Sequence, residues 1–202
     1  MKRIIISSLL FAYASITCAG EVNGVFGFKF NEAFLLPACK LGGDGRHHNV
    51  SDVTCVQPAR NLSGYDQKIR RIVLSYNESS IWLKSDVLYA FEKNGKLVGV
   101  MFYTKGYETQ DMVNNVLSNK FGHEPETVTP YVLQDRFGRE YSVSFKTWYA
   151  DNSVIANYNP AVNIYNSSLN DLDEANVIVE TEAGREYRES IKTKVNKKSR
   201  SF

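Results

Sequence analysis

The stretch VLYAFEKNGKLVGVMFY, residues 87–103, decides the fold of this 202-residue chain. Two apolar runs, residues 87–92 and 96–103, flank the turn sequence Lys93-Asn94-Gly95. Asn-Gly between two such runs is the strongest short-range signal for a β-hairpin, because both central positions of a type I′ turn need a positive φ. The stretch therefore predicts two antiparallel strands joined by a tight turn.

One clear helical pattern follows the hairpin. Thr109 can cap this helix, Asp111 lies in its first turn, and Gly122 can end it. Four apolar residues with helical spacing give it one apolar face, namely Val113, Val116, Leu117 and Phe121. We therefore expect a central helix that packs on a sheet.

Strand patterns surround this helix. Residues 131–134, 140–148 and 154–158 are separated by short turns, and in 140–148 the alternation predicts that Tyr141, Val143 and Phe145 face inward. Residues 177–181 predict a last strand. The fold class is α+β: a mostly antiparallel sheet with one main central helix on a β-meander and a disulfide-closed N-terminal loop. Segment 182–198 is highly charged and could form a helix, but it has no strong apolar face. The sequence therefore does not decide between a helix and a loop for this segment.

The N-terminal part combines an aromatic strand pattern with a pair of cysteines. Residues 25–30 alternate, so Phe26, Phe28 and Phe30 are expected on one face of a strand. Cys39 and Cys55 enclose a glycine-rich segment, residues 40–54, and a disulfide between them would contribute about 3 kcal/mol. A metal site is the alternative, because His47 and His48 lie between the cysteines. No zinc-type ligand spacing is present, so we expect the disulfide and no metal.

The first nineteen residues have the pattern of a secretory signal. Lys2 and Arg3 precede an apolar run that ends at Ala19, before the expected cleavage site. The run is too short to span a bilayer, which needs about 20 apolar residues. Lipid attachment at Cys18 is the alternative, although the residues before it fit a lipoprotein site poorly. The sequence thus predicts a periplasmic or secreted protein with a single domain, residues 20–191, and no transmembrane segment.

Charge argues against nucleic acid as a partner. Outside the signal, the 22 acidic residues are balanced by as many basic ones, so no global field attracts a polyanion. Residues 192–202 are nevertheless basic and contain no acid. We expect this segment to be a disordered tail that makes at most weak contact with anionic surfaces.

Three segments of the chain carry recognisable motifs. Gly24 and Gly27 form a G-x-x-G opening that is followed by Pro37 and Cys39. Segments 102–110 and 117–125 resemble the patterns T-x-G-x-x-x-Q and L-x-x-K-[YF]-G-x-P. Together these motifs resemble a family of small exported proteobacterial proteins of uncharacterised function, although Asn31 departs from the family's opening pattern. The resemblance implies a fold but assigns no catalytic residue. The helix and meander also resemble the fold of an outer-membrane lipoprotein that supports barrel assembly.

Motifs of known chemistry are missing from the sequence. It contains no nucleophile elbow, zinc-protease helix, phosphate-binding loop or dinucleotide fingerprint, so we expect no catalytic residue and no cofactor. His123, in the turn after the helix, is expected to be structural. The candidate binding residues are those in the enclosed loop and near turns: His47, His48, Tyr107, Trp148 and Tyr149.

These observations favour a non-enzymatic periplasmic or secreted interaction protein. One version is an inhibitor or immunity-type binder of a secreted enzyme, and another is a helper in envelope assembly. The expected partner is another envelope or secreted protein. The alternatives are a secreted hydrolase without a recognised motif and a protein that binds a small ligand between the helix and the sheet.

Overall fold

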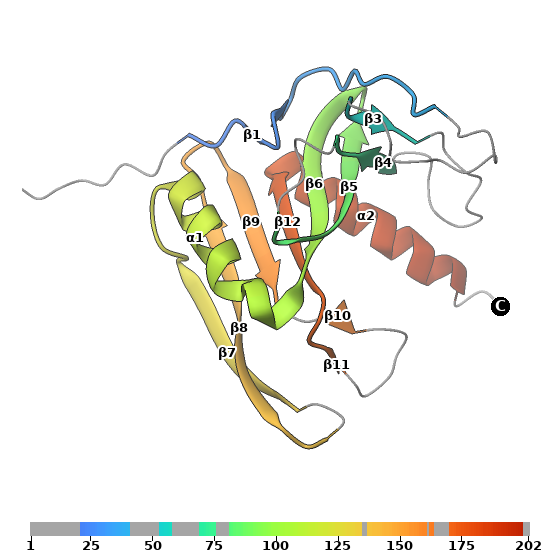
Figure 1. Ribbon diagram of the computed structural model, residues 1–202. Coiled ribbons are helices and arrows are strands. Elements are labelled where there is room, and N and C mark those ends of the chain that lie inside the picture. The colour runs from blue at the N-terminus through green and yellow to red at the C-terminus, as the bar shows by residue number, and fades with distance from the viewer. Residues whose placement is uncertain are drawn as a thin grey trace, which may run out of the picture.

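The centre of the molecule is one large antiparallel sheet (Figure 1). The computed structural model describes residues 21–40, 53–57, 69–75, 81–134, 137–160, 162–163 and 170–199. The predicted signal, residues 1–19, and His47 and His48 lie outside the described residues. Eight strands form the sheet, in the order β3 (Cys55–Val56), β4 (Ile69–Val73), β5 (Leu83–Lys93), β6 (Lys96–Thr104), β12 (Ala175–Thr181), β9 (Val154–Asn159), β8 (Glu140–Tyr149) and β7 (Thr127–Gln134).

The strand order is symmetrical about the middle of the sheet. Strands β3 to β6 form a meander that is followed by the 3-10 turn η2 (Gly106–Thr109) and helix α1 (Gln110–Phe121). Strands β7, β8, β9 and β12 form a second meander, followed by helix α2 (Glu182–Ser199). The two meanders join where β6 pairs with β12, from Thr104↔Ala175 to Gly99↔Glu180. Between β9 and β12 the short strands β10 (Val162–Asn163) and β11 (Asn170–Asp171) pair with each other.

The predicted hairpin in residues 87–103 is confirmed. It lies inside the sheet as β5 and β6, and its turn residues Asn94 and Gly95 have φ values of 55° and 76°. These are the left-handed values that a type I′ turn requires. Because β4 covers one side and β12 the other, neither strand of this hairpin is an edge.

Helix α1 covers one face of the sheet, as the sequence predicts. Val113, Leu117 and Phe121 are buried in the main core, whereas Val116, also expected on the apolar face, is 38% exposed. Gly122 ends the helix in the left-handed conformation, with φ 80°. The expected cap is absent: Thr109 makes no side-chain cap bond, and its hydroxyl donates to the carbonyl of Gly106 instead.

Helix α2 covers the opposite face, so the fold has two helices rather than one main helix. Successive side chains of a strand point to opposite faces. In β12, Val179 therefore belongs to the core under α1, whereas Glu180 bonds to Arg188 of α2. The helix continues through Ser199, so residues 192–199 of the expected disordered tail are helical.

The N-terminal aromatic segment is a tight turn rather than one strand. Two-residue strands β1 (Gly24–Val25) and β2 (Phe28–Lys29) pair around Phe26 and Gly27, which both have positive φ, 49° and 76°. Gly24 is required because a Cβ there would lie 1.9 Å from the carbonyl oxygen of Phe28. The turn lets Phe26 pack edge-on against Phe102 in the core, at 5.1 Å between ring centroids.

The predicted disulfide between Cys39 and Cys55 is confirmed. It ties the N-terminal segment to β3 at one edge of the sheet. The amide of Cys39 also donates to the carbonyl of Val56, and Ala38 forms a parallel bridge with the same residue. This edge strand is thus short and covered, which protects it from pairing with another chain.

No helix in the described part of the chain is long and apolar enough to cross a membrane.

Candidate functional site

The structure does not bring together the three predicted binding residues that it describes, Tyr107, Trp148 and Tyr149. Tyr107 is half-buried in η2, and its ring packs edge-on against Tyr141 at 5.2 Å. Tyr149 is 45% exposed and lies at the other end of β8 from Tyr141. These two tyrosines therefore belong to different regions of the surface.

Trp148 is a core residue and not part of a recognition surface. Its side chain is fully buried in the main core, and its indole Nε1 donates to the hydroxyl of Ser118 in α1 at 3.2 Å. The sequence places Trp148 near a turn, which suggested exposure. The strand continues to Tyr149, however, and α1 covers the face on which Trp148 lies.

The interface between α1 and the sheet is filled by side chains. Val113, Leu117 and Phe121 pack there against core residues such as Tyr158 and Val177. Burial raises the pKa of the Tyr158 phenol, which has no hydrogen-bond partner. In the described residues, no group of three or more His, Cys, Asp or Glu side chains could hold a metal ion.

The outstanding surface feature is the β7–β8 hairpin, which projects from the sheet (Figure 1). Strand β9 pairs only with residues 146–149 of β8, whereas β7 pairs with β8 from Gln134↔Glu140 to Thr127↔Thr147. The outer half of the hairpin consequently has no neighbouring strand on the β9 side. The sequence predicts the strands and the turn, but not this projection, because it depends on where β9 ends.

Exposed apolar side chains concentrate on this hairpin. Ten large hydrophobic side chains are exposed in the described part of the chain, and half of them lie on the hairpin: Val128, Val132, Phe137, Phe145 and Tyr149. Phe137, in the turn, is 70% exposed. By the register of the strands, Val128 and Val132 lie on one face of the hairpin and Phe145 on the other, so the exposed apolar side chains do not form one patch.

Aromatic rings and one arginine organise the hairpin. At its end, the guanidinium carbon of Arg139 lies 5.6 Å from the ring centroid of Phe137 and 5.9 Å from that of Tyr141. We call these three residues the hairpin tip. Further along, Tyr131 stacks on Phe145 at 4.7 Å, and burial raises the pKa of Tyr131. The ring contacts hold the tip side chains in place before any partner binds.

A small second core supports the hairpin. Leu133 of β7 and Val143 of β8 are buried, and Tyr107 and Leu172 pack against them from the start of α1 and the approach to β12. The hairpin is thereby braced against the body of the protein through its middle and through Tyr141, while Phe137 and Arg139 stay exposed. The signal for this site in the sequence is Phe137-Gly138-Arg139, an aromatic and an arginine inside a predicted turn.

The motif glycines that carry the family resemblance have structural roles. Gly106 has φ 62°, and a Cβ there would lie 2.0 Å from the carbonyl oxygen of Leu172. Gly24 and Gly122 serve the N-terminal turn and the end of α1, as described above. Backbone geometry therefore accounts for glycine at these motif positions.

No family model, curated protein or solved structure matches the chain.

Proposed function

We propose that this is a non-enzymatic interaction protein and that the hairpin tip binds a partner protein. The observation that carries the proposal is the exposure of Phe137 beside Arg139 at the end of a projecting, braced hairpin. Aromatic residues and arginine dominate the residues that contribute most to protein–protein binding. A hairpin that only completes a sheet does not need an exposed phenylalanine beside an arginine at its turn.

The tip defines the chemistry of its partner. Phe137 would enter an apolar pocket, while the Arg139 guanidinium would pair with a carboxylate at the rim of that pocket. The contacts of Arg139 with Phe137 and Tyr141 fix its position and so reduce the side-chain entropy lost on binding. An inhibitor or immunity-type binder would insert this tip into the cleft of a secreted enzyme, and an envelope-assembly helper would dock it on a partner.

Recognition through side chains fits the edge strand better than pairing of another strand. Strand β7 is the open edge of the sheet, but it contains Pro130, which has no backbone N–H to donate. Proline at an edge discourages the addition of a further strand. We therefore place the binding determinants at the tip and not along the backbone of β7.

The expected compartment supports a partner that is itself an envelope or secreted protein. Disulfides persist in oxidising compartments such as the periplasm or the extracellular space. The Cys39–Cys55 disulfide and the sequence pattern of residues 1–19 are both compatible with export. The partner should therefore be sought in an envelope or secreted fraction.

Affinity capture with matched variants tests the proposal. The protein is expressed as the full chain and used to capture partners from an envelope extract, with the wild type compared with Phe137→Ala and Arg139→Ala. We expect a stoichiometric partner whose binding is weakened at least tenfold by either substitution. Leu35→Ala is the control, because Leu35 is 86% exposed on a different segment. All three substitutions should leave stability within about 0.5 kcal/mol.

Two outcomes would count against the proposal. A partner that the tip variants still bind with wild-type affinity would show that another surface is used. Turnover in a substrate panel, unaffected by the tip substitutions and with no partner captured, would favour the hydrolase alternative.

A further inference from the structure

A second inference concerns the imidazole of His123, in the turn between α1 and β7. Its Nδ1 lies 2.7 Å from the carbonyl oxygen of Glu124, and its Nε2 lies 3.0 Å from the carbonyl oxygen of Tyr149. The second contact joins the turn after α1 to the end of β8, 26 positions along the chain. We infer that His123 is a protonation-dependent clasp between these two segments.

The chemistry of the two acceptors requires a charged ring. A carbonyl oxygen only accepts hydrogen bonds, so each ring nitrogen must carry a proton to bond to its carbonyl. Neutral imidazole has one N–H and one acceptor nitrogen, whereas imidazolium has two N–H groups. Both hydrogen bonds therefore exist together only in the imidazolium form.

The groups that face the ring favour its positive charge. Glu126, on the approach to β7, places Oε1 3.4 Å from Nε2, and its Oε2 accepts from the amide of Tyr149 at 3.1 Å. Asp151, in the turn between β8 and β9, adds a second carboxylate that favours protonation. From α1, the ring of Phe121 meets the imidazole edge-on at 6.3 Å. The carboxylate of Glu124 is turned to α1, where it accepts from the hydroxyl of Ser118.

These contacts raise the pKa of His123 above its ordinary value of 6.5. The hydrogen bond to the carbonyl of Glu124 is the largest cause, partial burial opposes it, and the Tyr149 carbonyl, Glu126 and Asp151 add to the increase. A group whose pKa is raised on folding contributes stability that is fully present below the unfolded-state pKa. That contribution is lost as the pH rises through the folded-state pKa.

Deprotonation would open one side of the clasp. Glu124 is the adjacent residue and stays near the ring, whereas Tyr149 belongs to a different element. We therefore expect the neutral ring to keep its proton on Nδ1 and to lose the bond to Tyr149. The turn between α1 and β7 would then be held to β8 only by the Glu126 carboxylate and the strand pairing.

NMR titration of the whole protein tests this clasp directly, because the chain has three histidines. We expect His123 to titrate above 6.5 and, below its pKa, to show both ring N–H protons protected from exchange with water by their bonds to the carbonyls of Glu124 and Tyr149. The amide of Tyr149 should shift with the same midpoint. In His123→Gln, which cannot titrate, that amide shift should disappear, while a His47→Gln/His48→Gln double variant should retain it.

The following results would contradict the proposed clasp. A pKa for His123 at or below 6.5, or ring N–H protons that exchange with water in the acidic form as fast as those of a free imidazolium, would overturn it. A Tyr149 amide shift that persists in His123→Gln would assign the titration to another group. If His123→Gln does not fold, the titration of the wild-type ring still decides between the two forms.

Discussion

The β5–β6 and β7–β8 hairpins are both antiparallel strand pairs with a glycine in the connection, but their surroundings differ. Each turns at a glycine with positive φ, Gly95 at 76° and Gly138 at 80°. The first hairpin is enclosed by β4, β12 and α2, and most of β6 is buried. The second forms the edge of the sheet, and β7 has a single fully buried residue, Leu133.

The comparison shows that the local sequence determines where each hairpin turns, whereas the neighbouring strands and helices determine how deeply its side chains are buried. A hairpin held between two other strands contributes its apolar side chains to stability. A hairpin at the edge keeps apolar side chains exposed, where they are available for binding. We therefore expect substitutions in the two hairpins to separate stability from recognition.

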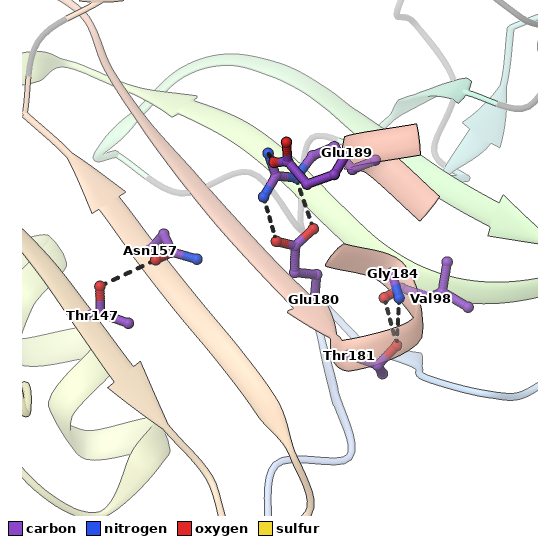
Figure 2. Close-up of polar contacts among 8 residues, drawn as sticks. Val98, Thr147, Asn157, Glu180, Thr181, Gly184 and Glu189 are labelled. Carbon is purple, nitrogen blue, oxygen red and sulfur yellow. Dashed lines mark hydrogen bonds and ion pairs between the residues drawn. The ribbon is translucent and has the colours of Figure 1, made fainter. Parts of the chain in front are cut away.

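We expect the largest loss of stability when the ion pair that joins α2 to β12, the strand beside the enclosed β5–β6 hairpin, is broken. Glu180 is fully buried on the face that α2 covers, and both of its oxygens accept hydrogen bonds from Arg188, at 2.7 and 2.9 Å (Figure 2). Arg188→Ala would leave this carboxylate buried without its charge partner. We expect a loss of about 3–5 kcal/mol in the free energy of unfolding, measured by urea denaturation.

Two variants sharpen that test. Arg185→Ala removes an exposed pair with Glu182 at 3.7 Å and should change stability by less than about 1 kcal/mol. The double variant Glu180→Met/Arg188→Met replaces the buried pair by apolar groups and should recover much of the loss. Equal losses in Arg188→Ala and Arg185→Ala would show that the buried pair does not anchor α2.

A matched pair of valines compares the two hairpins directly. Val100 in β6 is fully buried, whereas Val132 in β7 is 60% exposed. Val100→Ala should destabilise the protein by about 2 kcal/mol, because it removes two buried methyl groups and leaves a cavity. Val132→Ala should stay within about 0.5 kcal/mol. Thermal and urea unfolding of both variants gives the comparison, and a similar loss for Val132→Ala would mean that the edge hairpin is covered in solution.

The smallest difference is expected at the two turn glycines. Neither Gly95 nor Gly138 has atoms within 4 Å of an added Cβ, so alanine at either site meets only the penalty of positive φ, about 1 kcal/mol. We expect Gly95→Ala to lose this amount in global stability. Gly138→Ala should lose less than half of it, because the projecting end can relax without disturbing the sheet. Hydrogen exchange would then show the effect of Gly138→Ala only in the outer half of the hairpin.

The elements that the sequence predicts best are those specified by nearby residues. Asn94-Gly95 specifies the first hairpin, and apolar spacing specifies α1 up to Gly122. The Cys39–Cys55 disulfide follows from the number of cysteines left after the predicted signal. In each case the deciding interactions lie within about twenty positions of one another.

The elements that the sequence predicts poorly are held by residues far away in the chain, or have a hydrophobic periodicity that fits more than one structure. Alternating aromatics fit a strand, but the pair Phe26-Gly27 turns the chain within the same few residues. The described anchor of helix α2 is polar, so apolar spacing does not reveal it: Arg188 bonds to Glu180, and Thr181 caps the helix by accepting from the amide of Gly184 (Figure 2).

The candidate site was only partly predictable for the same reason. Tyr149 is exposed as expected, but Trp148, its neighbour, is covered by α1. The projection of Phe137 and Arg139 follows from the short pairing of β9 with β8, which no local pattern encodes. Surfaces defined by where a neighbouring strand stops need the three-dimensional structure.

The central position of β12 has a consequence for the order in which the sheet can form. This strand is the last of the eight along the chain, yet it joins the two meanders. Until residues 175–181 are in place, β6 and β9 each lack one of the neighbours that they have in the finished sheet. Unpaired strand edges can pair with other chains, so a folding intermediate that lacks β12 is the one most prone to aggregate.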